Sequence, residues 1–374
     1  MKACFLTSMM ALFLISCSQK TKDNSTENSS MMSQDENQII IDGNLAKNID
    51  SLLREEMNLG FSGTVSVIVN GKNILQNGYG WTDSLKTTAI TPLTGFYLAS
   101  TTKGLTGVAT LIAQQNGVIK TTDPLSKIDS ETSEEFANIT IRQMLTHTSG
   151  LSDEYETFGA TQRDENIQLI YKTPLGKEGD FNYTGAGYWL TAALIEKTAE
   201  IPYEEYVKDN IFRTAKMTNS DFWFELDEDN KKKYAQKLKK FPPNEVPPNW
   251  GFRASSGVIT NIIDLQRYFT ALISGKLLND ESLEELFGAH LTLGSGIGIG
   301  YGWFTTKTSR KTTEIWSRGG EGFGHNSAIR WFREENVIIL ILTNCGQIEG
   351  EDYEANKTVS DKIEKLLFEK DNIK

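Results

Sequence analysis

The regular pattern of apolar and polar residues begins near Ile39. Leu45, Ile49 and Leu53 recur at helical spacing, and Gly60 supplies a stop signal, so a first helix is expected between these points. Residues 63–69 then alternate valines with other residues, as a strand does, and the dipeptide at 70–71 is Asn-Gly, which favours a tight hairpin. A second strand is predicted over residues 73–81.

The other end of the chain repeats this pattern in reverse order. Residues 314–316, 328–332 and 337–342 are predicted strands, and a final helix is expected from the spacing of Val359, Ile363 and Leu366. Strands and flanking helices from both ends of the chain predict one α/β lobe, made of residues 39–95 and 251–374. Residues 96–250 are mostly helical in pattern and are expected to form an inserted, all-α lobe.

The first residues are expected to be a targeting segment and no part of the fold. Lys2 precedes a short apolar run, and Leu14-Ile15-Ser16-Cys17 resembles the lipobox of bacterial lipoproteins. This resemblance implies removal of residues 1–16, a lipid on Cys17, and residues 17–38 as a polar, disordered tether. Cleavage by an ordinary signal peptidase is the alternative. Either way the protein is expected to be extracytoplasmic, and with the lipid it is anchored to a membrane.

Composition excludes several classes of function. The net charge of −11 and the lack of a long basic block argue against a nucleic-acid partner. Loss of the leader leaves Cys345 as the one cysteine besides Cys17, so no intramolecular disulfide is expected and Cys345 is interpreted as a buried residue. The histidines, His147, His290 and His325, do not have metal-ligand spacing. No metal and no cofactor is therefore expected.

Ser100 and Lys103 are the candidate reactive pair. They lie at the start of a predicted amphipathic helix and, three residues apart, share one of its faces. A serine hydroxyl needs a base to become a good nucleophile, and a lysine amine can serve in its neutral form. Desolvation and the helix N-terminus both favour that form. A helix-capping serine beside a solvated lysine is the alternative.

Three segments carry a resemblance to a known family. They are Phe-Tyr-Leu-Ala-Ser-Thr-Thr-Lys-Gly-Leu-Thr-Gly at 96–107, Asp-Pro-Leu-Ser-Lys at 123–127, and Ile-Thr-Ile-Arg-Gln-Met-Leu-Thr-His-Thr-Ser-Gly-Leu at 139–151. They resemble the β-lactamase-related serine hydrolases, which include class C β-lactamases, D-alanyl-D-alanine carboxypeptidases and esterases. The resemblance implies a β-lactamase/transpeptidase-like fold, Ser100 as the nucleophile, Lys103 as its base and a structural role for His147.

The family's second motif, Tyr-x-Asn, is only partly present. Tyr183 matches its tyrosine, which implies a role in proton transfer with Lys103, although a packing aromatic is the alternative. Gly185 replaces the asparagine and offers no amide to a substrate's acylamide group. Asn182 precedes Tyr183 and is a weak substitute for that amide.

The third motif is expected at Ser317, Arg318 and Gly319, where the family has Lys-Thr-Gly or His-x-Gly. The N–H groups of Ser100 and Gly320 would form the oxyanion hole. Arg318 would bind a substrate carboxylate in place of the missing lysine or histidine, or else point outward. His325 is either a further cleft residue or a structural histidine.

These features predict a serine hydrolase that forms an acyl-enzyme on Ser100. The changes at Gly185 and Ser317 favour ester or unusual amide substrates over β-lactams and D-alanyl peptides. A cell-wall enzyme of the D-alanyl-D-alanine carboxypeptidase or β-lactamase type is one alternative. A catalytically silent surface protein that binds a ligand in the same cleft is the other.

Overall fold

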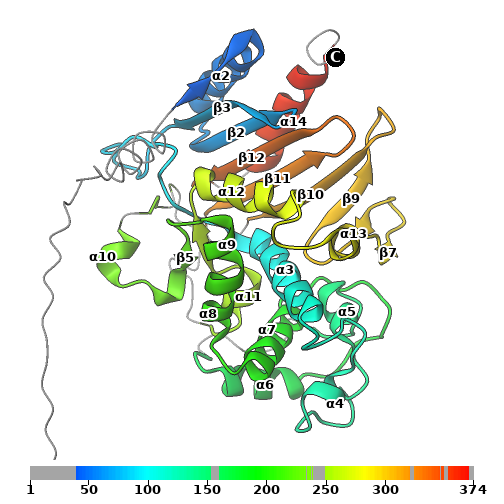
Figure 1. The fold of residues 1–374 in the computed structure, drawn as a ribbon. Helices are drawn as coiled ribbons and strands as arrows, with labels where there is room; N and C mark the ends of the chain where they lie inside the picture. Colours follow the sequence, from blue (N-terminus) through cyan, green and yellow to red (C-terminus); the bar gives the residue numbers. More distant parts are fainter. Residues whose placement is uncertain are drawn as a thin grey trace, which may run out of the picture. The chain divides into compact units, whose positions relative to one another are not determined.

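A nine-stranded sheet, antiparallel at every pairing, forms the centre of the structure, which is a computed structural model (Figure 1). The structure describes residues 39–152, 160–232, 234–236, 238, 249–320, 324–345, 347–348 and 353–369. From one edge to the other the strands are β1 (Ile40–Ile41), β3 (Lys72–Tyr79), β2 (Gly63–Val69), β12 (Val337–Thr343), β11 (Asn326–Phe332), β10 (Thr313–Gly319), β9 (Phe304–Lys307), β8 (Gly298–Ile299) and β7 (Leu291–Thr292).

The two ends of the chain meet at the centre of this sheet. β2 pairs with β12 from Val69 opposite Val337 to Gly63 opposite Thr343. Every residue of β12 is buried, as expected for a strand covered on both faces. Cys345, just beyond β12, is buried as well.

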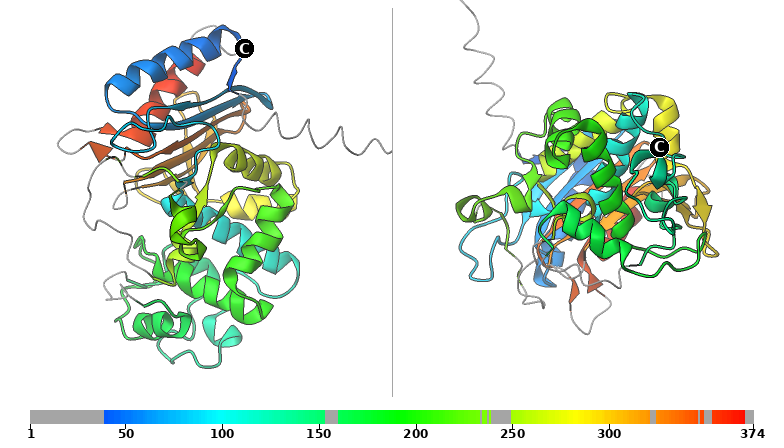
Figure 2. Two further views of the ribbon diagram at one scale, coloured as in Figure 1. Left: turned by 90° about the vertical axis from the view of Figure 1, so that its left-hand side faces the viewer. Right: turned by 90° about the horizontal axis from the view of Figure 1, so that it is seen from below.

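Two helices cover one face of the sheet, and they are the first and last of the described helices: α2 (Gly43–Asn58) and α14 (Ala355–Phe368) (Figures 1 and 2). Ile49 of α2 and Ile363 of α14 pack with Val65 and Val67 of β2 in one apolar cluster. The neighbouring Ile68 belongs to a second cluster on the opposite face, because successive strand residues point to opposite sides.

The second cluster joins the other face of the sheet to most of the remaining helices. The longer ones are α3 (Thr102–Gln115), α6 (Arg163–Tyr171), α7 (Ala186–Ala199), α12 (Ile262–Ile273) and α13 (Asp280–Phe287). The shorter ones are α4 (Leu125–Ile128), α5 (Ile141–Leu145), α8 (Tyr203–Val207), the π-helix η2 (Lys208–Phe212), α9 (Arg213–Ala215), α10 (Glu228–Lys231) and α11 (Phe252–Ser255), with 3₁₀ turns η1 (Ala99–Thr101) and η3 (Trp223–Glu225).

Two small sheets complete the described elements. One consists of β4 (Phe96–Tyr97), β6 (Val258–Thr260) and β5 (Asp221–Phe222), and the other of β13 (Gln347–Ile348) and β14 (Tyr353–Glu354). No helix in the described part of the chain is both long and apolar enough to cross a bilayer.

The predicted fold is confirmed: an antiparallel sheet with terminal helices and a mainly helical insertion between its strands. The pattern analysis missed β1 and β7 to β9, which are two to four residues long and carry no strong alternation. The lobe boundaries at 95/96 and 250/251 stay predictions. The leader, Cys17 and the tether lie outside the described residues.

Candidate active site

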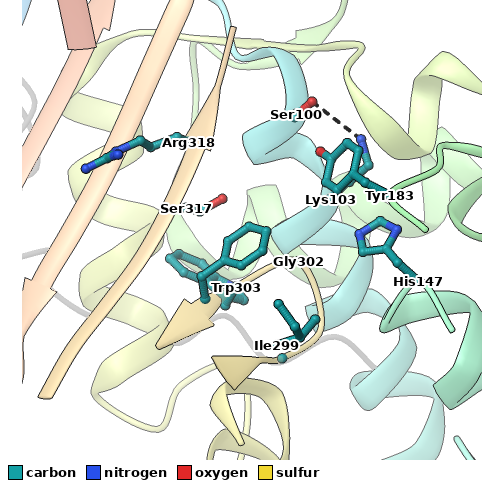
Figure 3. A pocket seen from close by; sticks show the side chains of 11 residues that line it. Ser100, Lys103, His147, Tyr183, Ile299, Gly302, Trp303, Ser317 and Arg318 are labelled. Atoms are coloured by element: carbon teal, nitrogen blue, oxygen red, sulfur yellow. Dashed lines mark hydrogen bonds between the residues drawn. The ribbon is translucent and has the colours of Figure 1, made fainter. Parts of the chain in front are cut away.

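Ser100 lies in the 3₁₀ turn η1, directly before α3, and Lys103 follows in the first turn of that helix. Nζ of Lys103 is 3.4 Å from Oγ of Ser100, so the spacing in the sequence does bring the two side chains together (Figure 3). Ala99, just before Ser100, has a φ of +50°, a left-handed conformation that costs a residue with a Cβ about 1–2 kcal/mol. Such strain is typical of a turn held in place for function.

Lys103 is buried without a carboxylate partner among the described residues. Its side chain is 5% exposed, and Nζ also donates to the main-chain oxygen of Ser255 at 3.3 Å. The rings of Tyr183 and Tyr188 lie with their centroids 4.8 and 5.7 Å from Nζ. No ion pair accompanies this lysine among the described residues, although a buried lysine usually has one.

Tyr183 lies in the loop directly before α7 and reaches over Lys103 from the helical side of the cleft (Figure 3). Its side chain is 44% exposed, the largest exposed fraction among the polar groups that converge on Ser100. A phenol in this place is open to an incoming substrate and close to the amine. This geometry fits the predicted role in proton transfer better than that of a packing aromatic.

His147 supports the loop of Tyr183 from below. Its ring stacks on the Tyr183 ring at a centroid distance of 4.5 Å, and Nδ1 accepts the N–H of Thr184 at 3.1 Å. Its carbonyl oxygen accepts the N–H of Asn182 at 2.8 Å. Burial, reinforced by the nearby Lys103, lowers the pKa of His147 from 6.5 to about 3, so the ring is neutral. A neutral ring whose Nδ1 is already engaged fits the structural role that the resemblance implies.

Gly185 lies close against an indole, so a side chain at this position would require the ring to shift. A Cβ on Gly185 would lie 3.0 Å from the ring of Trp189, and one on Gly251 would lie 2.2 Å from the same ring. The indole N–H donates to Oγ of Ser255 at 2.8 Å. An aromatic ring therefore fills the region beside the missing asparagine. Asn182 does not replace that amide, because its Nδ2 donates to the carbonyl oxygen of Leu151 at 2.9 Å.

The third motif lies on β10, and its two polar side chains point to opposite faces of the sheet. Both residues line the cleft, but the Ser317 hydroxyl points toward Ser100, whereas the Arg318 side chain extends away from it (Figure 3). The guanidinium of Arg318 lies 4.9 Å from the Trp316 ring centroid and 4.0 Å from Oδ1 of Asp361 on α14. The Arg318 side chain thus has the outward orientation that the sequence analysis gave as the alternative, and a role in binding a substrate carboxylate stays a prediction. Alternation along the strand turns only one of the two neighbours toward the cleft.

Gly319 and Gly320 end β10 beside the turn of Ser100. A Cβ on Gly319 would lie 2.7 Å from the amide nitrogen of Ser100 and 2.5 Å from the carbonyl oxygen of Leu98. Only a glycine permits this approach. The backbone of Gly320 follows at once, so the two predicted oxyanion donors belong to adjoining segments.

The cleft contains residues that the sequence analysis did not identify. Its lining is Ser100, Lys103, His147, Tyr183, Ile299, Gly300, Gly302, Trp303, Phe304, Ser317 and Arg318. Ile299, Trp303 and Phe304 come from β8, β9 and their connection, which were not predicted. Their main signal in the sequence is the close spacing of glycines from 294 to 302.

Other candidates lie outside the cleft lining. His325 packs near Phe96 and Tyr97, with ring centroids 6.2 and 6.5 Å away. Within the described ranges, no group of three or more His, Cys, Asp or Glu residues is arranged to hold a metal ion.

His147 makes folding depend on pH. Its pKa is about 3 in the folded protein and near 6.5 in the unfolded chain, so the unfolded state binds more protons below pH 6.5. The stability of the wild type should therefore fall by about 1.4 kcal/mol for each pH unit below 6.5 through this group. The variant His147→Asn lacks this pH-dependent contribution to stability. Asparagine keeps a hydrogen-bond acceptor and tolerates the φ of +60° at this position.

Urea unfolding at pH 7 and pH 5 measures this effect. The stability advantage of wild type over His147→Asn should shrink by about 2 kcal/mol between the two values of pH. The other titrating groups are common to both proteins and cancel in the difference. An advantage that stays constant across this range would contradict a neutral, buried His147.

Comparison with known proteins places this geometry in a family. Residues 49–361 match the Beta-lactamase family. The chain is 28% identical over 318 residues to "Putative penicillin-binding protein PbpX" of Bacillus subtilis (strain 168), over 82% of this chain and 77% of that protein.

Two solved structures share the fold. The octameric penicillin-binding protein homologue from Pyrococcus abyssi has a TM-score of 0.72 at 22% identity and covers 86% of this chain and 77% of its own. D-amino acid amidase from Ochrobactrum anthropi SV3, complexed with D-phenylalanine, has a TM-score of 0.75 at 18% identity, over 87% and 99% of the two chains. Since the family match spans most of the described fold and includes the Ser100–Lys103 pair, the chain belongs to the Beta-lactamase family of serine hydrolases.

Proposed function

We propose that this protein is a hydrolase that forms an acyl-enzyme on Ser100 and acts on ester or unusual amide substrates that carry no carboxylate beside the scissile bond. One observation carries the proposal: the buried amine of Lys103 lies 3.4 Å from the Ser100 hydroxyl and has no carboxylate partner among the described residues. A structural serine and lysine would gain nothing from this costly arrangement.

The chemical course follows from the positions of these groups. Ser100 Oγ attacks the substrate carbonyl, and its proton passes to the Lys103 amine. The negative oxygen of the tetrahedral intermediate accepts hydrogen bonds from the N–H groups of Ser100 and Gly320. The bond to the leaving group then breaks, and that group takes the proton by way of Tyr183. Water attacks the acyl-enzyme by the same route, which releases the acid and restores Ser100.

The cleft residues support neutral substrates. Ser317 occupies the place of the family's lysine or histidine, and Arg318 faces α14, so among the described lining residues Lys103 is the one lysine or arginine side chain directed at the cleft. A substrate carboxylate would have no guanidinium or ammonium partner except the general base itself. Apolar groups fit better, because Trp303 and Phe304 form one wall.

A second candidate is a cell-wall enzyme of the D-alanyl-D-alanine carboxypeptidase or β-lactamase type. It is favoured by the relative described as a putative penicillin-binding protein, which is 28% identical. A catalytically silent protein that binds its ligand in this cleft is the third possibility, and the strained turn and buried amine argue against it.

A fluorophosphonate tests the nucleophile. We expect the domain from Ile39 onward to gain one adduct by intact-mass spectrometry, and Ser100→Ala to gain none. Lys103→Met should react at least 10³-fold more slowly, because the hydroxyl then has no base. Ser84→Ala, at an exposed serine, is the matched control and should react like wild type. Absence of an adduct on folded wild type would favour the silent binding protein.

A matched pair of substrates tests the specificity. A D-alanyl-D-alanine peptide with a free carboxylate should have a kcat/KM at least tenfold below that of a short-chain nitrophenyl ester. Its C-terminal amide, which lacks the charge, should be hydrolysed at least as well as the acid. Arg318→Met should change the acid-to-amide ratio less than twofold, since its guanidinium is on the other face of the sheet. A strong preference for the peptide acid or for a cephalosporin would instead establish the cell-wall enzyme.

We further propose that Cys17 anchors the protein to a membrane on its extracytoplasmic side. The support is the Leu14-Ile15-Ser16-Cys17 sequence and the polar stretch that follows it. With full-length protein expressed in a bacterium, the wild type should fractionate with membranes and label with a fatty-acid probe. Cys17→Ala should lose both properties. Equal labelling of the two proteins would refute the lipid site.

A further inference from the structure

The peptide group between Gly319 and Gly320 is held from behind by the C-terminal helix. Its N–H is the second donor of the proposed oxyanion hole, and its carbonyl oxygen accepts a hydrogen bond of 3.3 Å from Nδ2 of Asn356. In a planar trans peptide the C=O and N–H bonds point in opposite directions. Asn356 therefore keeps the oxygen on its own side and directs the Gly320 N–H away from itself.

The Asn356 side chain is fully engaged. Nδ2 donates a second hydrogen bond, 2.8 Å long, to the carbonyl oxygen of Ser327 on β11, and Oδ1 accepts the N–H of Lys357 at 2.8 Å. Asn356 is 1% exposed and lies in the first turn of α14. The buried amide of Asn356 thus joins the end of β10 to the start of β11. Without it, the carbonyl oxygens of Gly319 and Ser327 would each lose a hydrogen-bond donor.

Ser327 supports the turn that carries the other proposed oxyanion donor, the Ser100 N–H. Its Oγ donates to the carbonyl oxygen of Leu98 at 2.6 Å and lies 2.8 Å from Oγ1 of Thr101. Leu98 and Thr101 flank the strained turn at Ala99, which carries the Ser100 N–H. The same β11 residue whose carbonyl Asn356 binds therefore ties the nucleophile's turn to the sheet.

We propose that Asn356 is a positioning residue for the oxyanion hole, which acts through the Gly319–Gly320 peptide, with Ser327 completing the support under Ser100. The inference rests on the proposed function, because it assumes that an oxyanion forms in this cleft. Asn356 is not among the residues that line the cleft, and it lies on the face of the sheet opposite Lys103. Its contribution is to keep two N–H donors at the separation that the transition state requires, since preorganised donors need no reorganisation during the reaction.

Asn356→Asp is the sharpest variant, because it keeps the shape of the side chain and replaces the donor by an acceptor. Asn356→Ala is the second variant, Ser327→Ala tests the other support, and Lys357→Ala is the control on the same helical turn. The probes are nitrophenyl acetate and its thiono analogue, in which sulfur replaces the carbonyl oxygen. Sulfur is a larger and weaker acceptor, so the thionoester draws little benefit from the oxyanion hole.

We expect kcat for the oxygen ester to fall about 10- to 100-fold in both Asn356 variants and in Ser327→Ala, somewhat less than for outright loss of a donor. KM should change less than threefold. The ratio of oxygen ester to thionoester rates should drop at least tenfold, which a general structural defect would not cause. Lys357→Ala should match wild type in every respect.

Circular dichroism and thermal unfolding show which variants are folded. If only one of Asn356→Asp and Asn356→Ala folds, that variant alone is enough for the test. An unchanged kcat and ratio in a folded Asn356 variant would overturn the inference and leave the proposed function intact. Equal losses on both esters would also overturn it. If wild type shows no turnover and no adduct that depends on Ser100, the proposed function fails and this inference fails with it.

Discussion

The close contact between the end of β10 and the turn of Ser100 is the constraint on which the site depends. The approach is so close that a single methyl group on Gly319 would collide with the amide nitrogen of Ser100. This contact brings the end of the interior strand β10 to the start of α3, so that Ser100, Lys103 and Ser317 all line one cleft. The left-handed conformation of Ala99 persists because buried groups of Leu98, Thr101 and Ser327 surround it.

The same packing separates the chemical machinery from substrate recognition. Lys103 is buried among aromatic rings and beside a neutral His147, an environment that suits a base. The resemblance implies substrate recognition at the second and third motifs. In this protein Gly185 and Arg318, which belong to those motifs, make packing contacts instead. The indole of Trp189 packs closely against Gly185, and the Arg318 guanidinium lies over the Trp316 ring on the α14 side of the sheet. This packing supports the proposed change of substrate class, while the end of β10 is still held by Asn356.

Features that depend on neighbours in the sequence were predicted well from the sequence alone. Alternation identified β2 and β12, and periodicity identified α2 and α14, because strand and helix geometry repeats over two to four residues. The Ser100–Lys103 pair belongs to the same class, since a spacing of three residues places both on one helical face wherever that helix lies. The short strands β7 to β9 were not predicted, because a strand of two to four residues is too short to show a clear alternation.

The sequence by itself therefore determined the family, the order of the main elements and the reactive pair. Only the tertiary structure decided which face of β10 borders the cleft. As a result the Ser317 side chain points into the cleft, and the Arg318 side chain lies near Asp361. The tertiary structure alone brought His147 under Tyr183, Trp189 beside Gly185, and Asn356 behind Gly319. The physical reason is that these contacts, apart from that of Gly185 with Trp189, join residues 36 to 43 positions apart across a packed core, and no local period of the chain encodes which surfaces meet.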